Sequence, residues 1–111
     1  MLVDDDAGFR DAARELFTRR GYAVLGEAAC AAAARAMVER CAPDLGVVDV
    51  RLGDDSGFEL ASALRRANPG LAVVLTSADQ DLGDPDRVSA SGARGFIAKS
   101  QLATADLSAF L

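Results

Sequence analysis

A short apolar run at residues 45–48 ends directly on a single carboxylate, Asp49. The run does not alternate between apolar and polar residues, which is typical of a parallel strand that is covered on both faces. A carboxylate at the end of a buried strand is costly unless it is paired or neutralised. The feature therefore predicts a buried parallel sheet with a charged site at one edge, completed by a cation or a neighbouring lysine.

Length and composition favour one compact domain over residues 1–111. Half of the 111 residues are hydrophobic, and a chain of this length can bury roughly two-thirds of its unfolded surface. The formal net charge of −5 argues against direct binding of nucleic acid, which requires a basic face. The sequence has no signal peptide and no apolar run of membrane length, so we expect a cytoplasmic protein without membrane contact.

The chain contains no histidine, which excludes Ser-His and Cys-His catalysis and histidine metal sites. It has two cysteines, Cys30 and Cys41. On one helix, their Cα atoms would lie about 16 Å apart, too far for a disulfide. We therefore expect two reduced thiols.

Apolar periodicity divides the chain into alternating strands and helices. Short apolar runs predict strands at residues 1–3, 22–25, 45–48, 71–75 and 96–98. Helical spacing predicts helices at residues 8–20, 27–41 and 58–64, a weaker helical segment at 79–91 and a last helix at 104–111. This alternation predicts a parallel sheet with helices on both faces, connected by right-handed crossovers.

Unusual polar residues follow the predicted strands directly: Asp4, Asp5, Asp49, Thr76 and Lys99. In sheets of this kind, functional sites form at the carboxyl ends of the strands. Several carboxylates at one edge favour a hard divalent cation such as Mg²⁺, while a lysine and a hydroxyl suit phosphoryl oxygens. These residues predict a phosphoryl-transfer site with a carboxylate nucleophile.

With these motifs, the chain resembles the receiver domain of bacterial two-component response regulators, similar to the chemotaxis response regulators. The resemblance rests on Asp4-Asp5 followed by Arg10, Asp49 with Gly57 eight residues on, and two further motifs, VVLTSA and GARGFIAKS. It extends over essentially the whole chain. The fold that it implies is a flavodoxin-like, doubly wound sheet of strand order 2-1-3-4-5, with helices on both faces.

The resemblance also implies roles for the acidic residues. Asp49 would accept a phosphoryl group from a phosphohistidine of a sensor histidine kinase or phosphotransfer protein, which fits a chain without histidine. Asp5, Asp49 and the backbone carbonyl of Arg51 would bind Mg²⁺, with Asp4 acting largely through water.

A switching role for the remaining motif residues is implied in the same way. Thr76 and Lys99 would contact the phosphoryl oxygens, and the rotamer of Phe96 would follow Thr76. Phosphorylation would then change the face made by the fourth helix, fifth strand and last helix. A partner protein, an output domain or a second copy in a homodimer could bind that face.

The chain departs from the family pattern in the loops around the site. Gly53 stands four residues after Asp49, where the family usually has proline. Ser100 follows Lys99 in place of the usual proline, so we expect a trans peptide bond there. Arg51 and Ala78 occupy loop positions that tune dephosphorylation in the family.

Two rival functions remain open at this stage. One is an interaction module with the receiver fold that works without phosphorylation. The other is a small Mg²⁺-dependent phosphatase, against which Arg51 counts because such enzymes usually have an acid two residues after the nucleophile. The first strand and last helix are short, so the chain could be a stand-alone receiver or one separated from an output domain.

Overall fold

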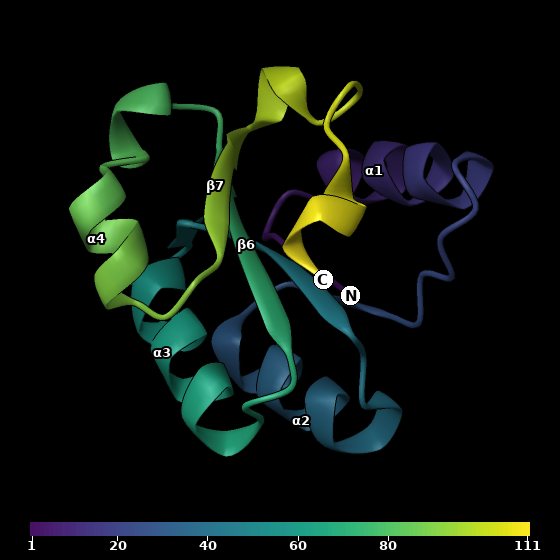
Figure 1. Cartoon of the computed structure of the whole chain (residues 1–111). Coiled ribbons are helices and arrows are strands. Elements are labelled where there is room, and N and C mark those ends of the chain that lie inside the picture. The colour runs from purple at the N-terminus through teal and green to yellow at the C-terminus, as the bar shows by residue number, and fades with distance from the viewer.

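The computed structural model describes residues 1–111 and shows a parallel sheet with helices on both faces (Figure 1). The five strands are hydrogen-bonded in the order β2-β1-β3-β6-β7, and all four pairs are parallel. This confirms the predicted flavodoxin-like order 2-1-3-4-5. The strands are β1 Leu2–Val3, β2 Glu27–Ala28, β3 Leu45–Asp49, β6 Ala72–Ser77 and β7 Gly95–Ala98.

The helices form two layers. The first helix, α1, lies on one side of the sheet with the last turn of the chain, and three helices, α2 to α4, lie on the other (Figure 1). None of the helices is long and apolar enough to cross a membrane. The α-helices are α1 Ala7–Arg19, α2 Ala31–Cys41, α3 Gly57–Ala67 and α4 Pro85–Ala90, and the 3-10 turns are η1 Gln80–Leu82, η2 Lys99–Gln101 and η3 Leu107–Phe110.

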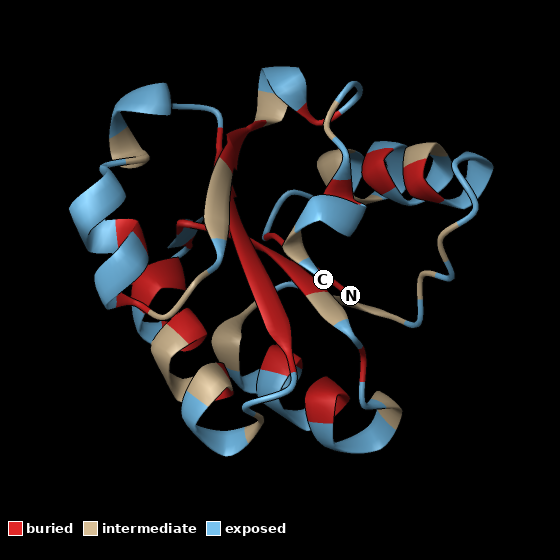
Figure 2. Ribbon diagram, viewed as in Figure 1, coloured by how far each residue is buried: buried red, intermediate tan, exposed pale blue.

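The core is split by the sheet into two apolar clusters. Figure 2 shows β6 buried along its length, and all six of its residues are buried. Val73 packs into the cluster under α2 to α4, whereas Val74 packs into the cluster under α1. Because successive strand residues point to opposite faces, an unbroken apolar run covers both. The absence of alternation in the strand sequences is thereby explained.

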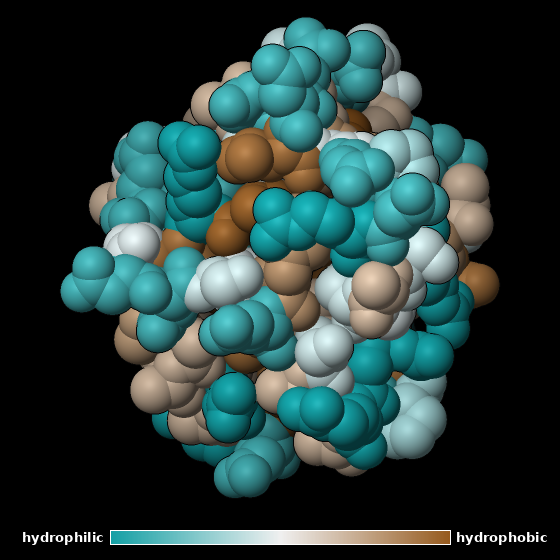
Figure 3. Space-filling model, turned by 90° about the vertical axis from the view of Figure 1, so that its left-hand side faces the viewer, coloured by the Kyte–Doolittle hydropathy of each residue, from teal (hydrophilic) through white to brown (hydrophobic).

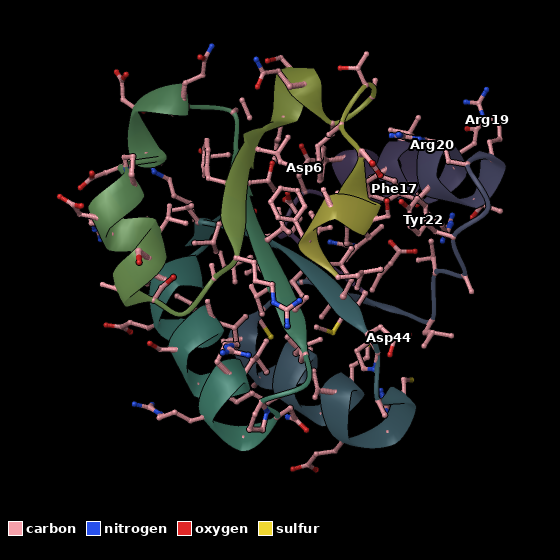
Figure 4. The ribbon with its side chains drawn as sticks, in the orientation of Figure 1. Asp6, Phe17, Arg19, Arg20, Tyr22 and Asp44 are labelled. Carbon is pink, nitrogen blue, oxygen red and sulfur yellow. The ribbon has the colours of Figure 1, made fainter.

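The prediction of a second strand at residues 22–25 is wrong. The strand lies at β2, where Glu27 pairs with Leu2 and Ala28 pairs with Val3. Residues 22–25 instead line an apolar cavity of about 360 Å³ beside α1. Tyr22 packs edge-on against Phe17 there, with ring centres 6.2 Å apart. Figure 4 labels the two residues next to each other.

The start of α2 also differs from the prediction, because residues 27 and 28 belong to β2. Cys30 precedes the helix as its N-cap, and Cys41 is its last residue. Both thiols are free, as predicted.

The C-terminal segment forms no α-helix, contrary to the prediction for residues 104–111. Only the 3-10 turn η3 forms, capped by Asp106, whose carboxylate accepts a hydrogen bond from the amide of Ser108. Leu107 nevertheless anchors the turn in the core.

One loop has more structure than the sequence indicates, and the weak helical segment is divided in two. A small antiparallel hairpin of β4 Arg51–Leu52 and β5 Asp55–Ser56 forms directly after Asp49, where we expected only a loop. The weak segment at residues 79–91 divides into η1 and the short α4, which agrees with its poor helical signal.

Gly57 begins α3 at a point where the helix touches the end of β3. Its amide donates a hydrogen bond to the carbonyl oxygen of Val50 at 2.7 Å. A Cβ atom at this position would overlap the carbonyl oxygen of Asp49. Only glycine therefore allows α3 to pack this closely against the backbone that carries Asp49.

We expect Gly57→Ala to lower the free energy of unfolding by about 1–3 kcal/mol, because overpacking forces the backbone apart. Gly70→Ala is the matched control, since nothing lies within 4 Å of a Cβ there. Urea unfolding of both variants measures the effect. Equal midpoints for the two variants would show that the contact is not tight.

Candidate functional site at the carboxyl ends of the strands

The sheet brings the predicted polar residues together at one edge. Asp4 follows β1, Asp49 ends β3, Thr76 lies in β6 and Lys99 follows β7. Asp49 pairs with Thr76 in the β3–β6 register, so the two residues are neighbours. Asp4, Asp49 and Thr76 are only 1%, 6% and 0% exposed, whereas Asp5 lies at the surface. The predicted convergence is confirmed.

Three carboxylates from two strand ends form an acidic cluster. Asp4, Asp5 and Asp49 each offer an oxygen, and these atoms lie within 4.8 Å of one another. Asp4 Oδ2 is buried without a well-directed hydrogen bond, although Lys99 Nζ lies 2.7 Å from it. Crowded carboxylate oxygens with unused acceptor capacity fit a hard cation such as Mg²⁺. The three carboxylates are therefore suitable ligands for a divalent cation such as Mg²⁺.

Lys99 neutralises the two buried members of this cluster. Its Nζ lies 2.7 Å from Asp4 Oδ2 and 3.1 Å from Asp49 Oδ2. Burial by itself would lower the pKa of Lys99, but hydrogen bonds and charge attraction from Asp4 and Asp49 outweigh it and raise the pKa. Lys99 is therefore fully charged at neutral pH and is the cation that holds the site together.

Asp49 combines burial with several hydrogen bonds. Burial raises the pKa of Asp49 above its ordinary value, and repulsion from Asp4 adds to the rise. The backbone amide of Arg51, which donates to Asp49 Oδ1 at 3.2 Å, and the side chain of Lys99 oppose it. The bond also places the backbone of Arg51 beside the carboxylate, while the Arg51 side chain is exposed.

The Thr76 hydroxyl and the Phe96 ring make their contacts outside the acidic cluster. The Thr76 hydroxyl donates a 2.6 Å hydrogen bond to the carbonyl oxygen of Ile97 in β7. Phe96 is half-buried on β7, and its ring lies so close to Gly83 that a Cβ there would overlap it. Thr76 is therefore next to Asp49 in register, but its hydroxyl is engaged by the neighbouring strand.

The peptide bond after Lys99 is trans, as predicted from Ser100, since the chain has no cis peptide bond.

Sequence reasoning missed three contacts around the site. The ring of Phe9 lies 4.1 Å from Lys99 Nζ, although its sequence position indicated only the apolar stripe of α1. Arg10, known only as part of the motif, donates to the carbonyl oxygen of Asp4 at 2.6 Å. Asp55 accepts a hydrogen bond from the first amide of α2, at Ala31, over 3.1 Å. The contacts of Phe9 and Asp55 join segments far apart in sequence, and a local sequence pattern does not indicate them.

Comparisons with known proteins agree with this geometry. The chain matches the family model of the response regulator receiver domain over residues 1–110. It is 42% identical over 77 residues to the DNA-binding transcriptional activator DevR/DosR of Mycobacterium tuberculosis, which is 68% of this chain and 35% of that protein. It is 35% identical over 82 residues to the sensory transduction protein LytT of Bacillus cereus, which is 72% of this chain and 33% of that protein.

A solved structure matches at the level of fold and sequence. It is the crystal structure of a two-component response regulator of the LuxR family from Aurantimonas sp. SI85-9A1, with a TM-score of 0.84 and 33% sequence identity. The match covers 90% of this chain and 72% of that one. The chain spans between a third and a half of the length of the first curated relatives that it matches.

The buried charge of Asp49 generates a prediction for stability. Without a divalent cation, we expect Asp49→Asn to unfold at a higher temperature than the wild type at pH 7, because the amide removes a desolvated, repelled charge. Because the pKa of Asp49 is raised in the folded state, the ionised carboxylate destabilises the fold, and this destabilisation is fully present above the folded-state pKa. It disappears as the pH falls through that pKa toward the unfolded value.

The measurement is thermal unfolding of both proteins in EDTA across the acid range. The advantage of Asp49→Asn should shrink as the pH is lowered. Asp54→Asn, at an exposed position of the same loop, is the control and should change little. An advantage that stays constant with pH would contradict the assignment of the cost to the Asp49 charge.

Proposed function

The chain belongs to the response regulator receiver domain family, and from this premise we propose that Asp49 is its phosphoacceptor. The observation that carries the proposal is the ion-paired cluster of Asp4, Asp49 and Lys99 at the carboxyl ends of three strands. Asp49 is the carboxylate in this cluster that ends a central strand, with β1 on one side and β6 on the other. A receiver domain of this kind is a phosphorylation switch rather than an enzyme acting on other molecules.

The proposed reaction transfers one phosphoryl group from a histidine to Asp49. A carboxylate oxygen of Asp49 forms a bond to phosphorus while the bond between phosphorus and the donor imidazole nitrogen breaks. The electron pair leaves with that nitrogen. Because this chain has no histidine, the donor belongs to another protein or domain.

The positive side chain at the site has a defined task in this reaction. Lys99 Nζ already lies within 3.1 Å of Asp49 Oδ2, so a small movement brings it to a phosphoryl oxygen bound there. Thr76 is adjacent to Asp49, and its hydroxyl would exchange the carbonyl of Ile97 for a phosphoryl oxygen. Such an exchange would loosen a contact with β7, the strand that carries Phe96, and we propose this as the switching step.

The resident cation of the site, in our proposal, is Mg²⁺. Asp5 and Asp49 would hold it with the backbone carbonyl of Arg51, and Asp4 would act largely through water. A bound Mg²⁺ supplies charge compensation for the incoming phosphoryl group. The acidic cluster supports this proposal, because its three carboxylate oxygens lie within reach of a single ion.

The partner of the reaction would be a sensor histidine kinase or a phosphotransfer protein. Family membership supports this and a cytoplasmic setting. We further propose that α4, β7 and η3 form the responding face, for an output domain, a partner protein or a second copy. Figure 3 shows a group of apolar side chains among hydrophilic ones on the face formed by the α3–α4 side. Residues near α4 and β7, including Val88 and Phe96, also line a shallow hollow.

The proposed function predicts a covalent adduct on Asp49. After incubation with acetyl phosphate and Mg²⁺, the intact wild-type mass should rise by one phosphoryl group. Asp49→Ala should show no rise, and Lys99→Ala should show a strongly reduced one because its positive charge no longer stabilises the transferred group. Intact-mass spectrometry detects the adduct directly.

Controls separate a failed reaction from a short-lived product. EDTA should abolish the adduct, and beryllofluoride should still bind if hydrolysis is merely fast. If the wild type gains no mass and binds no beryllofluoride, the phosphoacceptor proposal is wrong. The chain would then be an interaction module that works without phosphorylation, whose partner binds Asp49→Asn and the wild type equally.

Metal binding by the cluster has its own test. Millimolar Mg²⁺ should raise the unfolding midpoint of the wild type, because a ligand that binds only the folded state stabilises it. Asp5→Asn should lose most of the shift, whereas Asp11→Asn, an exposed acid outside the cluster, should retain it. Equal shifts in both variants would exclude the acidic cluster as the binding site.

A further inference from the structure

The ring of Phe9 covers the lysine of the site. Phe9 is a half-buried residue of α1, and Lys99 Nζ lies 4.1 Å from the centre of its ring. At this distance an ammonium group is attracted to the negative face of the ring. Lys99 is thus held by two carboxylates and by an aromatic ring, and its side chain is only 19% exposed.

The acidic motif itself determines where this ring lies. Asp4 Oδ1 accepts a hydrogen bond from the amide of Asp6 at 2.9 Å. Asp6 in turn caps α1 and accepts a hydrogen bond from the amide of Phe9 at 3.2 Å. Figure 4 shows Asp6 at the end of α1 near the centre of the molecule, with Arg19 and Arg20 at the other end.

Apolar packing fixes the other side of the ring. Phe9 packs against the core cluster under α1, which includes Phe17, Val47 and Ile97. A buried or half-buried ring that is anchored at its backbone and on one edge has little freedom to turn away. The position of Phe9 is therefore set by the same residues that form the site.

We propose that Phe9 is a positioning residue for phosphorylation, which holds Lys99 Nζ over Asp49 through a cation–π contact. The inference rests on the proposed function of Asp49 and adds a residue to its machinery. Phe9 does not touch the reacting atoms; it acts through Lys99.

The ring differs from the two carboxylates in an important respect. When a cation compensates the charges of Asp4 and Asp49, their attraction for Lys99 weakens. The attraction of the ring for Nζ does not depend on those charges. Phe9 therefore keeps the ammonium group at the site in the state in which the phosphoryl group arrives. It also shields Nζ from water, which strengthens its interaction with a phosphoryl oxygen.

The test compares aromatic and aliphatic replacements of Phe9. In the presence of Mg²⁺ and acetyl phosphate, Phe9→Leu should slow the phosphorylation of Asp49 about threefold to tenfold, as expected for the loss of one cation–π contact. Phe9→Trp and Phe9→Tyr should stay within about twofold of the wild type because both keep a π face. Tyr22→Leu, which also replaces a half-buried ring by leucine but lies beside Phe17, away from the site, should have no effect.

A second readout does not require phosphorylation. Proton NMR of the metal-free protein should show the ε-methylene protons of Lys99 shifted by the ring current of Phe9. The shift should vanish in Phe9→Leu and persist in Phe9→Tyr. Loss of the shift together with the slower reaction in Phe9→Leu, and retention of both properties in Phe9→Tyr, would support the inference.

Different results would contradict the role of Phe9, its contact with Lys99 and the phosphorylation of Asp49. A Phe9→Leu variant that reacts at the wild-type rate, or aromatic variants that slow as much as Phe9→Leu, would overturn the inference and leave the role of Asp49 intact. Absence of the ring-current shift in the wild type would overturn the contact itself. A wild-type protein that is never phosphorylated would overturn the proposed function, and with it any role of Phe9 in the reaction.

Discussion

The ion pairs of Lys99 with Asp4 and Asp49 hold the charged site of this fold together. Two buried carboxylates side by side would repel each other and lose their hydration. One lysine between them offsets part of that cost, and a divalent cation would offset more. The chain can therefore carry three acids at one sheet edge and still fold around a dry apolar core.

The fold serves this cluster by bringing three strand ends to one place. Asp4 and Asp49 come from the neighbouring strands β1 and β3, and Lys99 follows β7, the outermost strand of the sheet. Because the strands are parallel, all their carboxyl ends meet at the same edge. Gly57 lets α3 start directly against the backbone of Asp49, and Asp6 starts α1 one turn before Phe9. Local features of the helices thus support the geometry of the site.

The errors of sequence reasoning share a physical cause. Tyr22 and its neighbours have a strand-like composition. The residues that pair with β1 are nevertheless Glu27 and Ala28, so the strand forms there and not at residues 22–25. Residues after Asp106 have a helical composition, but they form only a 3-10 turn after the cap. The hairpin after Asp49 depends on two pairs, Arg51 with Ser56 and Leu52 with Asp55, in residues that read as a loop.

The sequence predicted a parallel sheet and the polar residues that follow its strands, because hydrophobic periodicity and strand-end positions are local properties. The strand order was implied by the resemblance to the receiver domain. Asp4, Asp49, Thr76 and Lys99 could be placed at one edge once the strands were known. The directions of the side chains follow from the tertiary structure. It directs the Thr76 hydroxyl to Ile97 and lays the Phe9 ring over Lys99. Such contacts depend on packing between distant segments, which periodicity does not encode.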